Sequence, residues 1–342
     1  MARETAVTSH DVAKLAGVSQ SAVSRTFRPG SSVSPQTSEK VRKAAEALGY
    51  RPNVLARSLV TGRSRIIGLV VGYFDNYFYP EAVGKFSKQL QEHGYHVLVF
   101  MASQREGTLD RVLDELLDYQ VDGIVLASVA MSSDIARRCD TAGIPVVLFN
   151  RSQDDERFSA ITSDNRAGGW KLAKFLAAGG HRRIAHVAGW AGASTQRDRE
   201  AGFVAGLAAS GLELHAREEG NFDYDQAREA THRLFAREDA PDAVFVANDH
   251  MAFSVLDTLR SELGLRVPED ISVVGYDDVA MAAWPCFSLT TVRQRSTRMV
   301  EEAIGMLFAR LEDRQSPPRR IAIDGPLVIR GSARKPAAAS AS

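Results

Sequence analysis

Near its N-terminus the chain reads Asp11-Val12-Ala13-Lys14-Leu15-Ala16-Gly17-Val18-Ser19-Gln20-Ser21-Ala22-Val23-Ser24-Arg25. Apolar side chains recur at helical spacing on both sides of Gly17: Val12, Ala13 and Ala16 before it, and Val18, Ala22 and Val23 after it. Because glycine has no Cβ, Gly17 permits a tight turn between the two segments. Two short helices joined in this way predict a helix-turn-helix, whose second helix enters the major groove of DNA.

A third helix completes the predicted headpiece. Thr8 or Ser9 is placed to cap the first helix, and the second is expected between Ser19 and Phe27. Ser34-Pro35 reads as an N-cap and a first helical residue, and Gly49 ends the apolar pattern that follows. Three short helices around a small core are therefore expected.

Several polar side chains of this headpiece suit contact with DNA. Gln20, Ser21 and Arg25 carry groups that hydrogen-bond base edges, and a guanidinium suits guanine. Hydroxyl groups expected to contact phosphates and fix the register lie at Thr8, Ser24, Ser34 and Thr37.

The distribution of charge agrees with such a role. Residues 1 to 65 hold 11 Lys and Arg against 4 Asp and Glu, a formal charge of +7 in a chain whose net charge is zero. The remaining residues therefore carry −7. A basic head on an acidic body confines phosphate contact to one end of the molecule.

The spacing of these residues resembles the headpiece of the lactose-repressor (LacI/GalR) family. The resemblance rests on three segments: Asp11 to Arg25, Val33-Ser34-x-x-Thr37-x-x-Lys40-Val41, and Leu48-Gly49-Tyr50-x-Pro52-Asn53-x-x-Ala56-Arg57-Ser58-Leu59. It extends over residues 66 to 331 and so over nearly the whole chain. It implies a helix-turn-helix DNA-binding headpiece at 1–51 and a hinge helix with its linker at 52–65.

The hinge segment from Pro52 to Val60 is too short to be a stable helix alone in water. By the resemblance, two hinge helices of a homodimer pack in the minor groove, where Leu59 wedges between base pairs. Asn53 and Ala56 are the further DNA contacts expected there. A flexible linker with an incidental leucine is the alternative interpretation.

From Ile66 onward, short apolar runs alternate with helical patterns. Buried strands are expected at 66–71, 97–100, 123–127, 146–149, 184–187, 244–247 and 271–274. Helices are expected at 82–93, 110–119, 134–142, 167–178, 199–210, 226–237 and 251–263. This alternation predicts an α/β core of doubly wound parallel sheets, and its length favours two lobes with a cleft between them.

The family resemblance implies that this core, residues 66–331, is periplasmic-binding-protein-like and serves effector binding and dimerisation. Lobe one is expected at 66–162 and 294–322, and lobe two at 163–293 and 323–331. Residues 332–342, rich in Ala and Ser, are expected to form a disordered tail. The tail has no leucine heptads, which favours a homodimer over a tetramer.

Polar and aromatic residues follow several predicted strands, where ligands of parallel sheets bind. Aromatic rings beside carboxylate, amide and guanidinium groups suit a sugar or a similar polyhydroxylated molecule, and Trp190 is one such ring. The resemblance implies effector contacts at Phe78, Asn150, Arg197, Phe222, Asn248, Asp277 and Gln294, with Arg197 gripping the ligand. Solvated or capping roles are the alternative for the polar residues, and core packing is the alternative for Phe78 and Trp190.

Other kinds of chemistry find no support in the sequence. The eight histidines form no H-E-x-x-H motif, and neither a Gly-x-Ser-x-Gly elbow nor a dinucleotide-binding glycine pattern is present. No metal, cofactor or catalytic site is expected. Cys139 and Cys286 are interpreted as small core residues. No apolar run is long enough to span a bilayer and no secretory signal is present, so a cytoplasmic protein is expected.

These patterns predict a ligand-responsive transcriptional regulator and not an enzyme. The expected partners are double-stranded operator DNA of pseudopalindromic sequence, a sugar-like effector and a second copy of the chain. A repressor released by an inducer is the first expectation. A corepressor-dependent regulator of the same fold is one alternative, and a solute-binding transport component, which would need export, is another.

Overall fold

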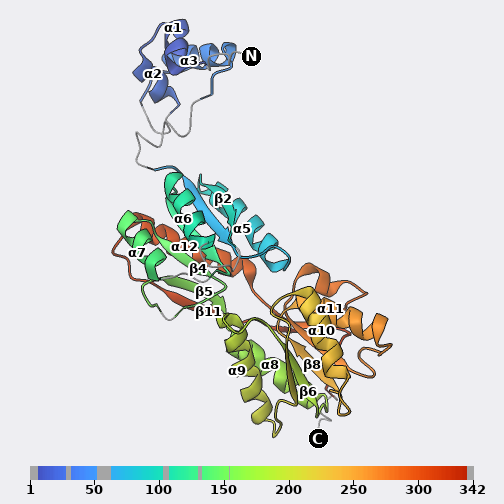
Figure 1. The fold of residues 1–342 in the computed structure, drawn as a ribbon. Helices are drawn as coiled ribbons and strands as arrows, with labels where there is room; N and C mark the ends of the chain where they lie inside the picture. Colours follow the sequence, from blue (N-terminus) through green and yellow to red (C-terminus); the bar gives the residue numbers. More distant parts are fainter. Residues whose placement is uncertain are drawn as a thin grey trace, which may run out of the picture. The chain divides into compact units, whose positions relative to one another are not determined.

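The computed structural model describes residues 7–27, 32–51, 63–102, 108–129, 133–153 and 155–336. The chain falls into two compact units, Met1–Ser64 and Arg65–Ser342 (Figure 1). The hinge segment 52–62, with the predicted contacts Asn53, Ala56 and Leu59, lies outside the described residues.

The N-terminal unit contains the predicted three helices: α1 Ser9–Ala16, α2 Gln20–Thr26 and α3 Pro35–Ala47. Thr8 caps α1 in a reciprocal capping box, in which Asp11 N donates to Thr8 Oγ1 and Thr8 N donates to Asp11 Oδ2. Gly17 adopts φ +64° at the turn, a conformation that glycine reaches without strain. The small core consists of Val12, Ala13, Val23, Val41, Ala44 and Ala45.

Lobe one of the second unit is built on a parallel sheet of order β11-β5-β4-β3-β1-β2. Its strands are β1 Ile66–Val71, β2 His96–Met101, β3 Gly123–Ala127, β4 Val146–Phe149, β5 Ser159–Ser163 and β11 Arg320–Ile323. Its helices are α5 Phe78–Glu92, α6 Thr108–Asp118, α7 Ser133–Ala142 and α12 Ser296–Glu312. Residues of α5 and α12 pack on one face of the sheet and residues of α6 on the other.

Lobe two has a second sheet, of order β12-β10-β9-β8-β6-β7, which is parallel except for the β10–β12 pair. Its strands are β6 Ile184–Ala188, β7 Ala216–Glu219, β8 Ala243–Val246, β9 Ser272–Asp277, β10 Thr290–Arg293 and β12 Leu327–Val328. Its helices are α8 Asn165–Ala178, α9 Ser194–Ala208, α10 Tyr224–Phe235 and α11 Asp249–Asp257, with a π-helical turn at Thr258–Glu262 and a 3-10 turn at Ala280–Ala283. Helices α8 and α9 cover one face, and α10 and α11 cover the other.

The chain passes from the first sheet to the second after β5, returns after β10 and passes again after β11. The doubly wound α/β fold with two lobes is thereby confirmed. The carboxyl ends of the parallel strands, where the polar residues follow, are the places at which such sheets bind ligands.

Two expectations need correction. Cys139 is buried, but Cys286 is exposed and is therefore not a core residue; it lies in the turn after Ala280–Ala283, where its carbonyl accepts a hydrogen bond from Arg260 Nη1. The predicted tail begins too early, because Ser332 and Ala333 are buried and Ser332 Oγ donates to Val273 O over 2.6 Å.

Among the described residues, no helix has the length and apolar character needed to cross a membrane. The same residues contain no group of three or more His, Cys, Asp or Glu side chains that is suited to holding a metal ion.

Candidate DNA-binding and effector-binding sites

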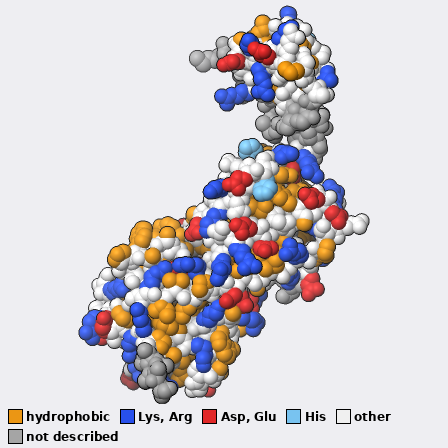
Figure 2. Space-filling view, turned by 180° about the vertical axis from the view of Figure 1, so that it is seen from behind, with side chains coloured by type: hydrophobic (Ala, Val, Ile, Leu, Met, Phe, Trp, Pro, Cys, Tyr) orange, Lys and Arg blue, Asp and Glu red, His pale blue; other side chains and the backbone are white. Residues whose placement is uncertain are grey.

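The second helix of the headpiece presents the predicted base-reading residues to solvent. Ala22, Val23 and Thr26 face the core, which leaves Gln20, Ser21, Ser24 and Arg25 exposed. Gln20 Nε2 donates to Ser9 Oγ over 2.8 Å, and Arg25 Nε donates to Ser21 O over 3.3 Å. In Figure 2, Lys and Arg side chains project from the headpiece.

Two of the predicted phosphate contacts also cap helices. Thr8 caps α1, and Ser34 caps α3 by accepting a hydrogen bond from Thr37 N over 3.2 Å. The hydroxyls of Ser34 and Thr37 lie 2.8 Å apart. Thr8 therefore lies at the N-terminus of α1, and Ser34 and Thr37 lie at the N-terminus of α3. At a helix N-terminus, backbone N–H groups and the helix dipole favour an anion such as a phosphate.

In the core, Asp277 at the end of β9 is the centre of a buried polar group. Its Oδ1 accepts hydrogen bonds from Gln294 Nε2 over 2.6 Å and from Arg199 Nη2 over 3.3 Å. Its Oδ2 accepts from Asn76 Nδ2 over 3.1 Å. Since Asn76 belongs to lobe one and Asp277 to lobe two, this carboxylate links the two lobes.

The backbone at this point is strained. Asp277 has φ +130° and the next residue, Asp278, has φ +57°. Residues other than glycine rarely adopt such backbone angles, and backbone strain of this kind concentrates at binding sites. The surrounding hydrogen bonds hold the Asp277 carboxylate in place despite that strain.

Arg199, on α9, is the buried arginine of this group. Its guanidinium lies 3.7 Å from the centroid of the Tyr276 ring. Nη1 donates to Ala247 O over 2.6 Å and Nε donates to Asn165 Oδ1 over 2.9 Å. Tyr276, Ala247 and Asn165 therefore fix the orientation of the guanidinium toward Asp277.

Arg197, the predicted effector arginine, is placed differently. It is exposed, and its Nη1 donates to the loop carbonyls of Gly192 and Ala191 over 2.9 and 3.3 Å. The structure brings Arg199, and not Arg197, to Asp277. A signal for this was present in the sequence: Arg199 precedes Gly202 and Phe203 by three and four residues, the spacing of one helical face, and both are buried.

Asp249, at the start of α11, is a second buried carboxyl. Burial, and then the neighbouring charge of Asp277, raise its pKa to about 8. Its Oδ2 accepts from Val279 N over 3.1 Å, and its Oδ1 lies 2.7 Å from Thr291 Oγ1. At neutral pH Asp249 is therefore predominantly protonated. Burial also raises the pKa of Asp277, while the charge of Arg199, with which it forms an ion pair, opposes that rise.

Three predicted effector residues have buried polar atoms that lack a hydrogen-bond partner among the described residues: Asn150 Oδ1, Asn248 Nδ2 and Gln294 Oε1. The other side-chain atom of each amide is engaged: Asn150 Nδ2 donates to Tyr79 Oη, Asn248 Oδ1 accepts from Met251 N, and Gln294 Nε2 donates to Asp277. Because buried polar atoms rarely remain unpaired, these atoms are suited to a ligand that carries both donors and acceptors.

The predicted aromatic residues differ in their surroundings. Phe78 is buried and stacks on Phe149 with ring centroids 6.2 Å apart, so that it packs into the core of lobe one. Phe222 is buried with φ +61° and lies against Gly189, where a Cβ would overlap its ring. Trp190 is half-buried beside the guanidinium of Arg151, 5.4 Å from the ring centroid.

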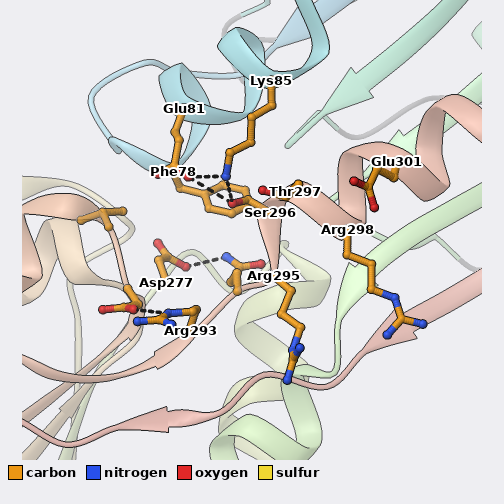
Figure 3. A pocket seen from close by; sticks show the side chains of 13 residues that line it. Phe78, Glu81, Lys85, Asp277, Arg293, Arg295, Ser296, Thr297, Arg298 and Glu301 are labelled. Atoms are coloured by element: carbon orange, nitrogen blue, oxygen red, sulfur yellow. Dashed lines mark hydrogen bonds and ion pairs between the residues drawn. The ribbon is translucent and has the colours of Figure 1, made fainter. Parts of the chain in front are cut away.

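A cavity of about 410 Å³ adjoins this polar group. Phe78, Asp277 and Gln294 line it, together with charged residues of α5, of the turn after β9 and of the segment that leads into α12 (Figure 3). Lys85 Nζ lies 2.5 Å from Glu81 Oε1 and 2.6 Å from Ser296 Oγ. The cavity thus lies between elements of both lobes.

The fold and these sites define a class of protein: a two-lobed ligand-binding core joined to a DNA-reading headpiece. Residues 8–53 match the family model for bacterial regulatory proteins of the lacI family, and residues 173–333 match the periplasmic binding protein-like domain. The transcriptional regulator CelR of Thermobifida fusca is 35% identical, with 97% of this chain and 100% of the relative covered. The transcriptional repressor PurR of Vibrio vulnificus (strain CMCP6) is 31% identical, with 95% and 98% covered.

Solved structures agree with these matches. The lac repressor dimer bound to operator and the anti-inducer ONPF has a TM-score of 0.86 at 28% identity, covering 96% of this chain and 99% of that one. A CelR–cellobiose complex has a TM-score of 0.73 at 32% identity, covering 96% and 100%. The chain belongs to the LacI family of bacterial regulatory proteins. It is a DNA-binding transcriptional regulator and not an enzyme.

Proposed function

We propose that this protein is a repressor that binds a pseudopalindromic operator as a homodimer and is released by a small polyhydroxylated effector. The observation that carries the proposal is the position of Asp277: it lies among predicted effector contacts and also bonds to Asn76 of the other lobe. A ligand that contacts this group acts directly on the link between the lobes. Its differential affinity for two lobe arrangements then changes the affinity for DNA.

The operator is read by the headpiece in this proposal. Gln20, Ser21 and Arg25 contact base edges, and Thr8, Ser24, Ser34 and Thr37 contact phosphates. Asn53, Ala56 and Leu59 act in the minor groove between the two half-sites. A regulator of this kind works where the chromosome is, which places it in the cytoplasm.

The effector contacts in this proposal are Phe78, Asn150, Trp190, Phe222, Asn248, Asp277 and Gln294, and Arg199 joins them. The similarity to a cellobiose-bound regulator favours a sugar or a sugar derivative. Arg197 remains a predicted contact. If Arg197→Ala abolishes the response to an effector and leaves operator binding intact, Arg197 grips the ligand; an unchanged response assigns that role to Arg199.

The test begins by selecting an operator from a random duplex library with the full-length protein. The expected result is a palindromic consensus whose binding weakens steeply with salt. Arg25→Ala should reduce the preference for particular bases by about 1 to 3 kcal/mol, whereas Arg42→Ala, an exposed arginine on α3, should not change that preference. If no consensus emerges, the proposed operator binding is wrong.

A thermal-shift screen against sugars, sugar acids, polyols and nucleosides then identifies stabilising ligands, because a ligand that binds only the folded state raises its stability. The proposal expects such a ligand to weaken operator binding. A ligand that strengthens operator binding would instead support the corepressor alternative.

A further inference from the structure

Arg151, two residues after the end of β4, is a buried charge outside the hydrogen-bond network of Asp277. The residue is 4% exposed, and its Nε and Nη2 have no hydrogen-bond partner among the described residues. The ion pairs found among these residues do not include Arg151. The contact that the structure shows for its guanidinium is the Trp190 ring.

Such a side chain is costly unless something offsets its charge. Arginine stays protonated in proteins, so that it cannot escape burial by losing its proton. An aromatic face attracts the cation but accepts no in-plane hydrogen bond from Nε and Nη2. Buried charges are normally paired and hydrogen-bonded, and within the described part of the chain Arg151 Nε and Nη2 have neither an ion-pair nor a hydrogen-bond partner.

Among the described residues, the charged groups next to Arg151 offer it no counterion. Arg199 is paired with Asp277. Asp249 is protonated at neutral pH because burial raises its pKa to about 8. Asp278 is paired with Arg293 and Arg330. None of these carboxyl groups is therefore available to Arg151.

The adjoining residue indicates what else the missing partner carries. Asn150 Oδ1 is a buried acceptor with no donor among the described residues, and Gln294 Oε1 is another. A molecule that satisfies both must present hydroxyl donors to these amides and hydrogen-bond acceptors to Arg151.

We propose that Arg151 pairs with an anionic group of the effector, so that the effector is an acidic sugar derivative carrying a carboxylate or a phosphate and not a neutral sugar. This inference rests on the proposed effector site. A guanidinium presents two parallel N–H groups to either anion, and the two sources are separated by experiment.

The test uses the full-length protein and matched probes: D-glucose, D-gluconate, D-glucuronate and glucose 6-phosphate, and D-galactose and D-galacturonate. Thermal shift and calorimetric titration measure binding, and fluorescence anisotropy measures release from the selected operator duplex. At least one acid should bind about 30-fold or more tightly than its neutral counterpart. If the tightest probe is a sugar acid, the anion is a carboxylate; if it is glucose 6-phosphate, the anion is a phosphate.

Arg151→Gln should lose that preference, whereas Arg182→Gln, an exposed arginine of lobe two, should keep it. In the absence of ligand, Arg151→Met should unfold at an unchanged or higher temperature, because an unpartnered buried charge has been removed. A merely structural arginine would give the opposite result, a lower unfolding temperature.

Several results would overturn the inference: neutral and acidic probes that bind equally, no stabilisation by any acid, acid binding that survives Arg151→Gln, or marked destabilisation by Arg151→Met. If a neutral sugar releases the operator, the proposed function is supported and the inference that the effector is acidic is wrong. Failure to bind any operator would contradict the proposed function alone.

Discussion

Two arginines of α9, two residues apart, lie in opposite surroundings. Arg199 is buried and paired with Asp277, whereas Arg197 is exposed and bonded to loop carbonyls. Loss of one partner of a buried ion pair leaves the other charge uncompensated, while an exposed charge contributes little.

Arg199→Gln should therefore lower the free energy of unfolding by about 3 to 5 kcal/mol. Arg197→Gln is the matched control and should change it by less than about 0.5 kcal/mol. Urea unfolding followed by circular dichroism measures both. Equal stability of the two variants would show that the pair with Asp277 does not stabilise the core.

Asp249 gives the stability a distinct dependence on pH. Its pKa is about 8 in the folded protein against an ordinary value of 3.8, so the folded state binds the extra proton. The stabilisation is fully present below about pH 4 and is lost as pH rises toward 8.

Asp249→Asn mimics the protonated acid, since an amide can donate to Thr291 Oγ1 and accept from Val279 N. The variant should gain stability relative to the wild type as pH rises from 5 to 8. Denaturant unfolding at several pH values measures this difference. A difference that does not vary with pH would mean that Asp249 is ionised throughout.

The sequence predicted the residue types of the effector site better than their geometry. Asn150, Asn248, Asp277 and Gln294 were predicted from the family resemblance, and the first three also follow predicted strands, whose carboxyl ends meet at a common edge of a parallel sheet. Which arginine turns inward depends on how α9 packs on α8, and Arg199 was missed although its helical face could be read. Whether the guanidinium of Arg151 finds hydrogen-bond partners depends on the side chains around it, and a sequence alone does not give their positions.

At the scale of elements, the close contact of α8 with α9 positions Arg199. A Cβ on Gly169 would lie 2.1 Å from Arg199 O and 2.8 Å from Phe203 N. A Cβ on Gly202 would lie 2.1 Å from Arg166 O. These distances are shorter than van der Waals contact, so the two backbones approach this closely only because glycine is present.

Gly169→Ala should therefore force the helices apart and destabilise the core by about 1 to 3 kcal/mol. Gly305→Ala, in the interior of α12, is the control, because a Cβ there meets nothing within 4 Å. That substitution should stabilise the protein by about 0.5 to 1 kcal/mol through helix propensity. Thermal unfolding of both variants decides: a tolerated Gly169→Ala would mean that the helices separate at little cost.

Long helices and buried central strands were recognised from periodicity, but several short strands were not. β7 reads Ala216-Arg217-Glu218-Glu219 and is an edge strand of its sheet. β11, Arg320–Ile323, is the edge of the other sheet and is largely open to solvent. Edge strands bury few side chains, so they lack the apolar pattern from which strands are predicted.

At the scale of the molecule, the headpiece and the core are separate compact units. The residues proposed to read DNA lie in Met1–Ser64, and those proposed to bind the effector lie in Arg65–Ser342. A chain that begins at Arg65 should therefore keep its thermal stabilisation by an effector and lose binding to the operator duplex.

Calorimetric titration and anisotropy measure these two properties on the same preparation. The full-length protein serves as the control and should show both. If the shortened chain binds the operator with the affinity of the full-length protein, the headpiece does not recognise the DNA.

The three passages of the chain between the sheets also constrain how the protein is made. Lobe one receives α12 and its edge strand β11 only after residue 323 has left the ribosome, and lobe two receives β12 and the buried Ser332 later still. Domains that are continuous in sequence are able to fold one after another during synthesis. Here the headpiece alone has that option, and both lobes wait for the last part of the chain. Until then β5 and β10 present unpaired strand edges, which are the kind of surface on which incompletely folded chains aggregate.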